Sequence, residues 1–373
     1  MQRGRNLNRI LGVILIIAVA ALLFAQVGCS ARGTCPPVID RVGHPPTRLG
    51  RNTLHIATAN LWGVSVLGFD WADDIDERFA AMAERLARNE PALDIVLIQE
   101  AWKDAARHAL LEHAGVARAF PYRVDVVDRP GGAGLVILSG FPIESAHFHR
   151  FRAQGRCIRF WEGDCISGKG ILIVQIVVGR RSFWIGDTHL IACYSSTEES
   201  EMACDLTDPN GDDRWQQTLE ARRAIETLAG DDPIVLGGDF NFTRTSRYYR
   251  LMTREEFPSE TPAPQAASSA SSALSESQTT KLPRGWGELS EETDVPNRLD
   301  YLWSRPGTEF RWHPLKAARP IFTEPVLLRS GERVPLSDHP ILATEFCLVR
   351  VDDPDPQCLA LTGIAGNAKR GSD

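Results

Sequence analysis

Residues 233–242 read Pro-Ile-Val-Leu-Gly-Gly-Asp-Phe-Asn-Phe. The apolar run at 234–236 is typical of a strand buried on both faces. Asp239 and Asn241 follow it, and alternation in an extended chain would place their side chains on one side. The carboxylate can accept a proton or hold a metal-bound water, and the amide can fix an oxygen, so the pair suits a phosphoester site. An Asx-type turn that ends the strand is the alternative interpretation.

Strand and helix patterns alternate on both sides of this segment. An amphipathic pattern predicts a helix over residues 73–89, between apolar strand runs at 54–60 and 94–100. Because hairpin-like strand runs lie between the helical segments, a layered α/β sandwich is favoured over a purely parallel wound sheet. Further strands are predicted at 122–127, 135–139, 171–178, 182–187, 299–303 and 341–349, with helices around 105–113 and 215–228.

Composition limits the functional classes. The 373 residues can build a sizeable core, since 43% of them are hydrophobic. The formal net charge of −7 does not favour general electrostatic attraction to nucleic acid. A local basic cleft can coexist with an acidic whole, so a duplex-binding nuclease is disfavoured without being excluded.

The N-terminal residues 1–29 have the features of an export signal or a membrane anchor. Arg3, Arg5 and Arg9 precede an uncharged apolar run at 10–25. Gly28-Cys29 resembles a bacterial lipoprotein signal, in which Cys29 would be acylated, although Gln26 departs from the usual aliphatic residue. An uncleaved anchor and a cleaved secretory signal are the alternatives. All three predict an exported protein, either membrane-anchored or secreted.

The remaining chain divides by composition. Residues 30–52 are proline-containing and lack periodicity, so they are expected to form a linker. Residues 53–349 are expected to form a single catalytic domain. Within it, residues 258–280 are rich in Ser, Ala, Pro and Thr and are predicted to be a flexible insertion. Residues 350–373 form a polar C-terminal tail.

Export would favour disulfides between the cysteines. Cys157 with Cys165 and Cys193 with Cys204 are the local candidates, and Cys358 could reach either Cys347 or Cys35. Zinc is the competing explanation, but no pair has Cys-x-x-Cys spacing, which makes a zinc site the weaker hypothesis.

Polar residues recur beside the predicted buried strands, which is where α/β folds place their sites. Each has an ordinary structural explanation as a turn former, a helix-entry acid or a satisfied core histidine. Taken together they indicate a site, because random placement rarely brings so many to separate apolar strands. The set comprises Asn60, Glu100, His189, Asp239, Asn241, Asp300, Asp338 and His339.

Six short motifs in this set resemble the endonuclease/exonuclease/phosphatase superfamily of metal-dependent phosphodiesterases. They occur in the family's order and span most of residues 54–346. The resemblance implies a four-layer α/β/β/α sandwich. The motifs are Thr58-Ala59-Asn60, Leu97-Ile98-Gln99-Glu100, Gly186-Asp187-Thr188-His189-Leu190, Gly237-Gly238-Asp239-Phe240-Asn241, Arg298-Leu299-Asp300-Tyr301 and Ser337-Asp338-His339.

The resemblance also implies a metal site. Glu100 would be the main ligand of a Mg²⁺ ion, assisted by Asn60 and Asp338, although Mn²⁺ or another divalent cation is an alternative. Mg²⁺ keeps several waters and prefers few carboxylates together with a substrate phosphate oxygen. The ion would withdraw charge from the phosphoryl group during attack.

The remaining residues receive their roles from the same resemblance. His339 would activate the attacking water, with Asp300 orienting its ring. Asp239 and Asn241 would position the water and stabilise the pentacovalent state, and His189 would donate to a phosphate oxygen. The assignment of base and acid between Asp239 and His339 stays open.

Within the superfamily, the chain resembles neutral sphingomyelinases. Residues 186–190 are similar to their histidine strand, and residues 164–170 are similar to a loop in which an Asp and a Lys organise the site; here these are Asp164 and Lys169. The apolar segment 64–71 would suit a lipid-facing lip, and packing over the following helix is the alternative.

Through this resemblance, the sequence predicts a monomeric, metal-dependent phosphodiesterase of the sphingomyelinase or phospholipase C type. Its N-terminus would associate it with a membrane. It would hydrolyse a phospholipid head-group phosphodiester by attack of water on phosphorus. An extracellular nuclease or another phosphatase of the superfamily is the alternative. A non-enzymatic binding scaffold is less favoured, because a complete polar set is present.

Overall fold

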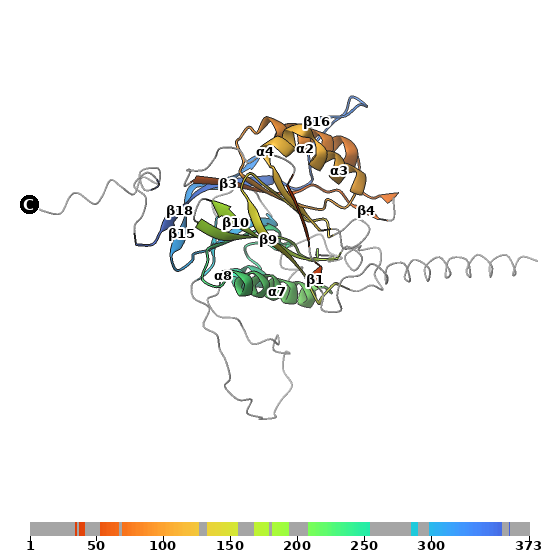
Figure 1. Cartoon of the computed structure of the whole chain (residues 1–373). Coiled ribbons are helices and arrows are strands. Elements are labelled where there is room, and N and C mark those ends of the chain that lie inside the picture. The colour runs from red at the N-terminus through yellow and green to blue at the C-terminus, as the bar shows by residue number, and fades with distance from the viewer. Residues whose placement is uncertain are drawn as a thin grey trace, which may run out of the picture.

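Two large sheets stack face to face in the computed structural model of this chain (Figure 1). The structure describes residues 34–35, 37–41, 53–66, 69–126, 133–155, 168–178, 181–193, 208–253, 285–289, 298–352 and 358. Each sheet has seven described strands, and both contain one parallel pair among antiparallel neighbours.

The first sheet has the order β1-β9-β10-β11-β12-β14-β13, in which β11 and β12 run parallel. Its central strands are almost wholly apolar, as expected for strands covered on both faces. The strands are β1 Thr34–Cys35, β9 Ile143–Arg150, β10 Gly170–Val178, β11 Arg181–His189, β12 Ile234–Asp239, β13 Gly287–Glu288 and β14 Asp300–Arg305.

The second sheet has the order β15-β18-β3-β6-β8-β7-β2, in which β3 and β6 run parallel. Two short hairpins, β4 with β5 and β16 with β17, stand apart from both large sheets. The strands of the second sheet are β2 Val38–Arg41, β3 Thr53–Asn60, β6 Ile95–Gln99, β7 Tyr122–Asp125, β8 Val136–Ser139, β15 Phe310–Ile321 and β18 Ile341–Arg350. The hairpin strands are β4 Ser65–Val66, β5 Phe69–Asp70, β16 Val326–Leu327 and β17 Arg333–Val334.

Helices cover the outer face of each sheet (Figure 1). The helices α2 Ile75–Arg88, α3 Asp104–Glu112 and α4 Ala114–Ala119 pack on the second sheet. The helices α7 Gly211–Ala229 and α8 Arg247–Thr253 pack on the first sheet. A third apolar cluster fills the space between the two sheets. This α/β/β/α order confirms the predicted four-layer sandwich.

The sequence pattern explains why α2 forms where it does. Phe79, Met82 and Leu86 recur at helical spacing, and all three are buried against the second sheet. The helix ends at Asn89, whose left-handed φ of 52° lets its N–H return to the carbonyls of Arg85 and Leu86. The predicted helix over 73–89 therefore matches the observed one to within two residues at its start.

The segment that begins with β12 differs from its predicted conformation. The strand continues through both glycines to Asp239. Position 238 requires glycine, because a Cβ there would lie 1.9 Å from the carbonyl oxygen of Thr188 on the neighbouring strand. Asn241 has a φ of 51°, so the extended alternation proposed for Asp239 and Asn241 is wrong. The chain turns at Asn241 instead.

Two long strands, β9 and β15, were not predicted. β9 carries mostly polar or small residues and is only partly buried. β15 includes Pro314 and Pro320 and changes register after Pro314, so its sequence lacks a continuous strand pattern. Short helices α4 and α8 were also not predicted.

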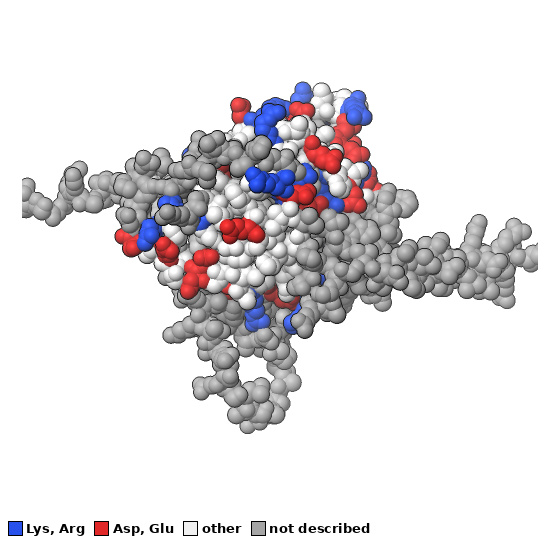
Figure 2. Space-filling model, viewed as in Figure 1, with Lys and Arg blue, Asp and Glu red and all other residues white. Residues whose placement is uncertain are grey.

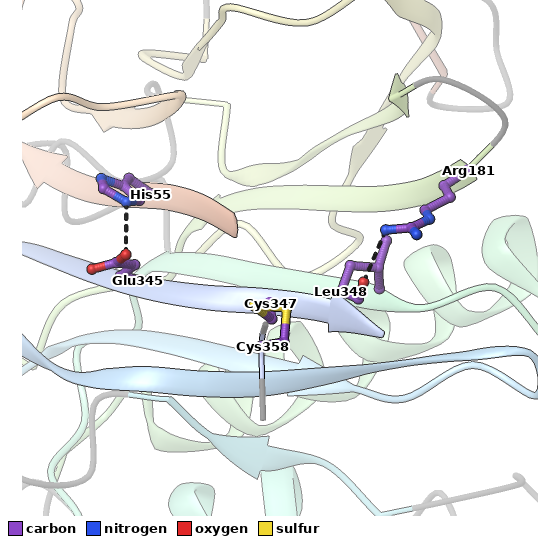
Figure 3. Close-up of a disulfide and its surroundings, with 6 residues drawn as sticks. All are labelled: His55, Arg181, Glu345, Cys347, Leu348 and Cys358. Carbon is purple, nitrogen blue, oxygen red and sulfur yellow. Dashed lines mark hydrogen bonds and ion pairs between the residues drawn. A yellow bond between two sulfur atoms is a disulfide. The ribbon is translucent and has the colours of Figure 1, made fainter. Parts of the chain in front are cut away.

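A disulfide joins Cys347 on β18 to Cys358, with the two Cα atoms 6.0 Å apart (Figure 3). It decides between the two partners considered for Cys358. The other candidate pairs include Cys157, Cys165 and Cys204, which lie outside the described residues. The predicted signal or anchor, the insertion 258–280 and Asp164 lie outside them as well. Among the helices that the structure describes, none is long and apolar enough to cross a membrane.

Candidate active site

The predicted site residues gather at one edge of the sandwich, where the two parallel strand pairs end. Asn60 and His189 are the last residues of β3 and β11, Asp239 is the last residue of β12, and Glu100 follows β6. β14 runs antiparallel to β12, and β18 runs antiparallel to β3, so the starts of these strands fall at the same edge. Asp300, Asp338 and His339 therefore come from strand beginnings rather than from strand ends.

Asn60 connects the two sheets at this edge. Its Nδ2 donates to Oε1 of Glu100 and to Oδ2 of Asp239, each at 2.9 Å. Its Oδ1 accepts the backbone N–H of Trp62 at 2.9 Å, which fixes the orientation of the amide. One fully buried side chain thus brings a carboxylate from each sheet together.

Glu100 has the features of a cation ligand. Its Oε2 is buried and has no hydrogen-bond partner within the described part of the chain. Burial raises the pKa of Glu100 to about 7, against the lowering effects of Asn60 and Lys169. Ligand atoms of Glu100, His189 and Asp239 all lie within 4.8 Å of one another. An unsatisfied carboxylate oxygen in such a cluster fits a hard divalent cation.

Lys169 holds His189 in one protonation state. The Lys169 Nζ lies 2.8 Å from Nε2 of His189 and donates to the carbonyl of Leu190 at 3.1 Å. An ammonium group can only donate, so Nε2 accepts and the imidazole is neutral. Burial and the charge of Lys169 both lower the pKa of His189 well below its usual value. Donation from Nε2 of His189 to a phosphate oxygen would therefore require Lys169 to release this atom.

His339 pairs with Asp300 across the site. Nδ1 of His339 lies 2.8 Å from Oδ2 of Asp300, and Nε2 lies 3.8 Å from Oδ2 of Asp239. Burial lowers the pKa of His339, but Asp239, Asp300 and Asp338 outweigh it and raise the pKa to about 11. Burial raises the pKa of Asp300 to about 6 despite the opposing charge of His339. The three carboxylates therefore favour the protonated form of the ring.

Asn241 and Asp338 sit at the margins of this arrangement. The N–H of Asn241 donates to Oδ1 of Asp239 at 2.9 Å, which is the Asx-type turn considered as an alternative. Its Nδ2 donates to the carbonyl of Leu190 at 3.0 Å. Asp338 is exposed, and its Oδ1 lies 3.2 Å from the hydroxyl oxygen of Ser337. Its charge raises the pKa of Glu100 and of His339.

Three further residues shape the site and were not assigned a role from the sequence. Gln99 donates to Oδ1 of Asp187 at 2.6 Å, a second polar link between the sheets. The ring of Trp102 lies 5.6 Å from that of His189 and 5.6 Å from Nζ of Lys169. Gln99 and Asp187 could have been noticed as polar residues inside apolar runs, whereas Trp102 has no comparable signal.

Known proteins resemble this chain in sequence and in fold. Residues 57–339 match the model of the endonuclease/exonuclease/phosphatase family, and the chain belongs to that family of hydrolytic enzymes. A putative neutral sphingomyelinase from Drosophila melanogaster is 28% identical over 200 residues, which are 53% of this chain and 41% of the relative. An inositol phosphosphingolipids phospholipase C from Schizosaccharomyces pombe is 26% identical over 205 residues, 54% of this chain and 44% of the relative.

The chain thus matches less than half the length of these two relatives. Among solved structures, sphingomyelinase C from Streptomyces griseocarneus superposes with a TM-score of 0.52 and 20% identity. The superposition covers 79% of this chain and 99% of that one. At this identity the likeness shows a shared fold.

Proposed function

We propose that this protein is a divalent-cation-dependent phosphodiesterase that hydrolyses the head-group phosphodiester of a phospholipid. The observation that carries the proposal is the buried, unsatisfied Oε2 of Glu100. The other oxygen of Glu100 accepts from Asn60, which also contacts Asp239, and Asp239 lies 3.8 Å from the ring of His339. Attack of water on phosphorus would release the phosphorylated head group.

Glu100 and Asn60 would hold the cation, with Asp338 as an additional carboxylate. Their oxygen donors suit Mg²⁺, and Mn²⁺ or another divalent cation is an alternative. When bound, such an ion withdraws charge from the phosphoryl group. Lys169, buried and 2.8 Å from His189, would add a fixed positive charge beside the same group.

Asp239 and His339 would handle the protons. The carboxylates around His339 favour its protonated form, in which the ring could donate a proton while Asp239 accepts one. Neutralisation of the surrounding carboxylates by a cation would return His339 toward its ordinary pKa and favour it as the base. The pH dependence of turnover separates these assignments, because a base gains activity as pH rises and an acid loses it.

A lipid substrate is supported by a projecting apolar residue and by the relatives. Trp71 follows the β4–β5 hairpin and is 58% exposed, although Trp is a side chain that proteins usually cover. Lys103 anchors the hairpin by pairing with Asp70 at 2.7 Å and with Asp76 at 2.8 Å. Both relatives compared above are described as enzymes of sphingolipids. Attachment to a membrane through residues 1–29 and export of the chain belong to the same proposal.

The surface charge gives a nuclease less support. On the face shown in Figure 2, acidic and basic side chains of the described residues are interspersed, without one continuous basic area. Phosphate contacts from Lys and Arg supply most of the affinity of a nonspecific nuclease. A buried carboxylate oxygen without a hydrogen-bond partner destabilises the fold. A binding scaffold without activity has no use for such an oxygen, whereas a cation-dependent enzyme does.

The test is hydrolysis by the full chain of a phospholipid panel and of DNA, each with Mg²⁺ and with excess chelator. We expect a phosphorylated head group to appear from at least one lipid, detected by phosphorus NMR, and only in the presence of the cation. DNA cleavage without turnover of any phospholipid would reverse the proposal in favour of a nuclease.

A further inference from the structure

Arg78 lies near the start of α2 and is only 3% exposed. All five N–H donors of its guanidinium reach backbone carbonyls. Nε and Nη2 donate to the carbonyl of Asp73 at 2.9 and 2.8 Å. Nη1 donates to Leu61 at 2.7 Å and to Leu336 at 3.4 Å, and Nη2 also donates to Trp62 at 2.8 Å. A guanidinium has five N–H groups in a fixed fork, so its capacity is fully used.

Three of these four carbonyls, those of Leu61, Trp62 and Leu336, belong to the two segments that carry the candidate active site. Leu61 and Trp62 directly follow Asn60, and Leu336 lies two residues before Asp338. The first segment is also paired with the end of β6, because the N–H of Gly63 donates to the carbonyl of Glu100 at 3.0 Å. A fixed position for residues 61–63 therefore fixes the backbone of the main candidate cation ligand.

Ser337 supports the same connection from the other side. Its hydroxyl donates to the carbonyl of Asn60 at 2.6 Å and accepts the N–H of His339 at 3.2 Å. The segments 60–63 and 336–339 are more than 270 residues apart in the chain, and they meet through Arg78 and Ser337. Arg78 is itself a residue of α2, so it also connects the two segments to that helix, which Ser337 does not.

The charge of Arg78 is not used in a direct ion pair among the described residues, since all five of its hydrogen bonds end on carbonyls. Burial lowers the pKa of Arg78, while the carboxylates of Asp338, Asp74, Asp73 and Glu100 raise it. Burying a charge without a direct counter-ion is costly. Arg78 therefore acts through the directions of its guanidinium hydrogen bonds rather than through attraction to one carboxylate.

We propose that Arg78 is a positioning residue of the site: it sets the separation between the Asn60–Glu100 side and the Asp338–His339 side. The consequence for turnover rests on the proposed function, but the positioning itself does not. Lysine cannot substitute, because its three donors radiate from one atom and cannot reach three separate segments.

The test compares the full chain with Arg78→Lys and with the control Arg222→Lys. Arg222 is also buried, at 1% exposed, but it lies on α7 and contacts Glu226 and the carbonyl of Leu251, outside the site. Two measurements are made on each protein: hydrogen–deuterium exchange without cation, and kcat and KM with bis(p-nitrophenyl) phosphate and Mg²⁺. Thermal unfolding midpoints show whether the two variants lose similar stability.

We expect Arg78→Lys to speed exchange in the peptides that contain residues 61–63 and 336–339. We expect kcat to fall about 10- to 100-fold with KM little changed, as for a misplaced catalytic group. Arg222→Lys should do neither. Unchanged exchange at both segments, or equal losses of kcat in the two variants, would overturn the proposal. If the wild-type chain hydrolyses no diester, the proposed function fails separately, and exchange alone decides the role of Arg78.

Discussion

Asp300 holds Nδ1 of His339 at 2.8 Å, and this contact turns Nε2 of the ring toward Asp239. The orientation follows from strand register, because Asp300 and Asp239 lie directly opposite each other on β14 and β12. The imidazole comes from the other sheet, just before β18. A pair of adjacent carboxylates on one sheet thus orients an imidazole that belongs to the second sheet.

His339→Ala should lower turnover on the order of 10²-fold or more, as expected for loss of a general acid or base. Asp300→Asn should cost less, because the ring remains present but is less well oriented. Steady-state kinetics on the diester that the wild type prefers would measure both. A fully active Asp300→Asn protein beside an inactive His339→Ala protein would show that the pairing has no role in turnover.

Glu100→Gln should abolish most cation binding while the fold stays intact. The substitution keeps the shape of the side chain and its place beside Asn60, but it removes the charge that attracts a divalent cation. Calorimetric titration with Mg²⁺ and turnover with and without chelator would report this. Glu345→Gln is a matched control, since Glu345 pairs with His55 and Lys316 at the far end of β3. Wild-type turnover in excess chelator would refute the cation-dependent hypothesis.

Lys169→Met should impair turnover at least about 10-fold, since under the proposed function it deletes a preorganised charge beside the phosphate of the substrate. It also frees Nε2 of His189 and leaves a side chain of similar length under the ring of Trp102. Lys316→Met, at an exposed position far from the site, serves as the control. Equal kcat values for the two variants would remove Lys169 from the mechanism.

Replacing Leu67, Phe69 and Trp71 by serine should weaken hydrolysis of lipid vesicles more than hydrolysis of a soluble chromogenic diester. The exposed Trp71 lies in this segment, and loss of apolar side chains weakens insertion at a lipid interface. Val351→Ser changes another exposed apolar residue, just beyond the end of β18, and should leave both rates unchanged. An equal loss on both substrates would argue that the segment acts through packing and not through lipid contact.

The sequence predicts those parts of the fold and site that depend on local patterns. Buried strands such as β6 and β12 are continuous apolar runs, and Glu100 and Asp239 stand out because each follows such a run directly. The structure then brings Asn60, Glu100, His189, Asp239, Asp300 and His339 to one edge.

Other features depend on contacts that no local pattern records. Arg78 looks like an ordinary helix residue in the sequence, yet one of its acceptors, Leu336, lies 258 residues away. The turn at Asn241 depends on a left-handed backbone that the alternation rule does not include. β15 was missed because its prolines interrupt the pattern, while its pairing with β18 supplies the order that its own sequence lacks.

The pairing of β18 with β3 has a consequence for the order in which the molecule is made. β3 ends at Asn60, but its antiparallel partner begins only at Ile341, so a growing chain carries an open β3 edge while residues 61–340 are made. Such an edge presents unpaired backbone groups to other chains. Asp338 and His339 emerge immediately before the strand that closes it. A nascent chain must therefore be extended through β18 before its β3 edge is closed, and a product truncated before Ile341 would keep that edge open and be prone to aggregate.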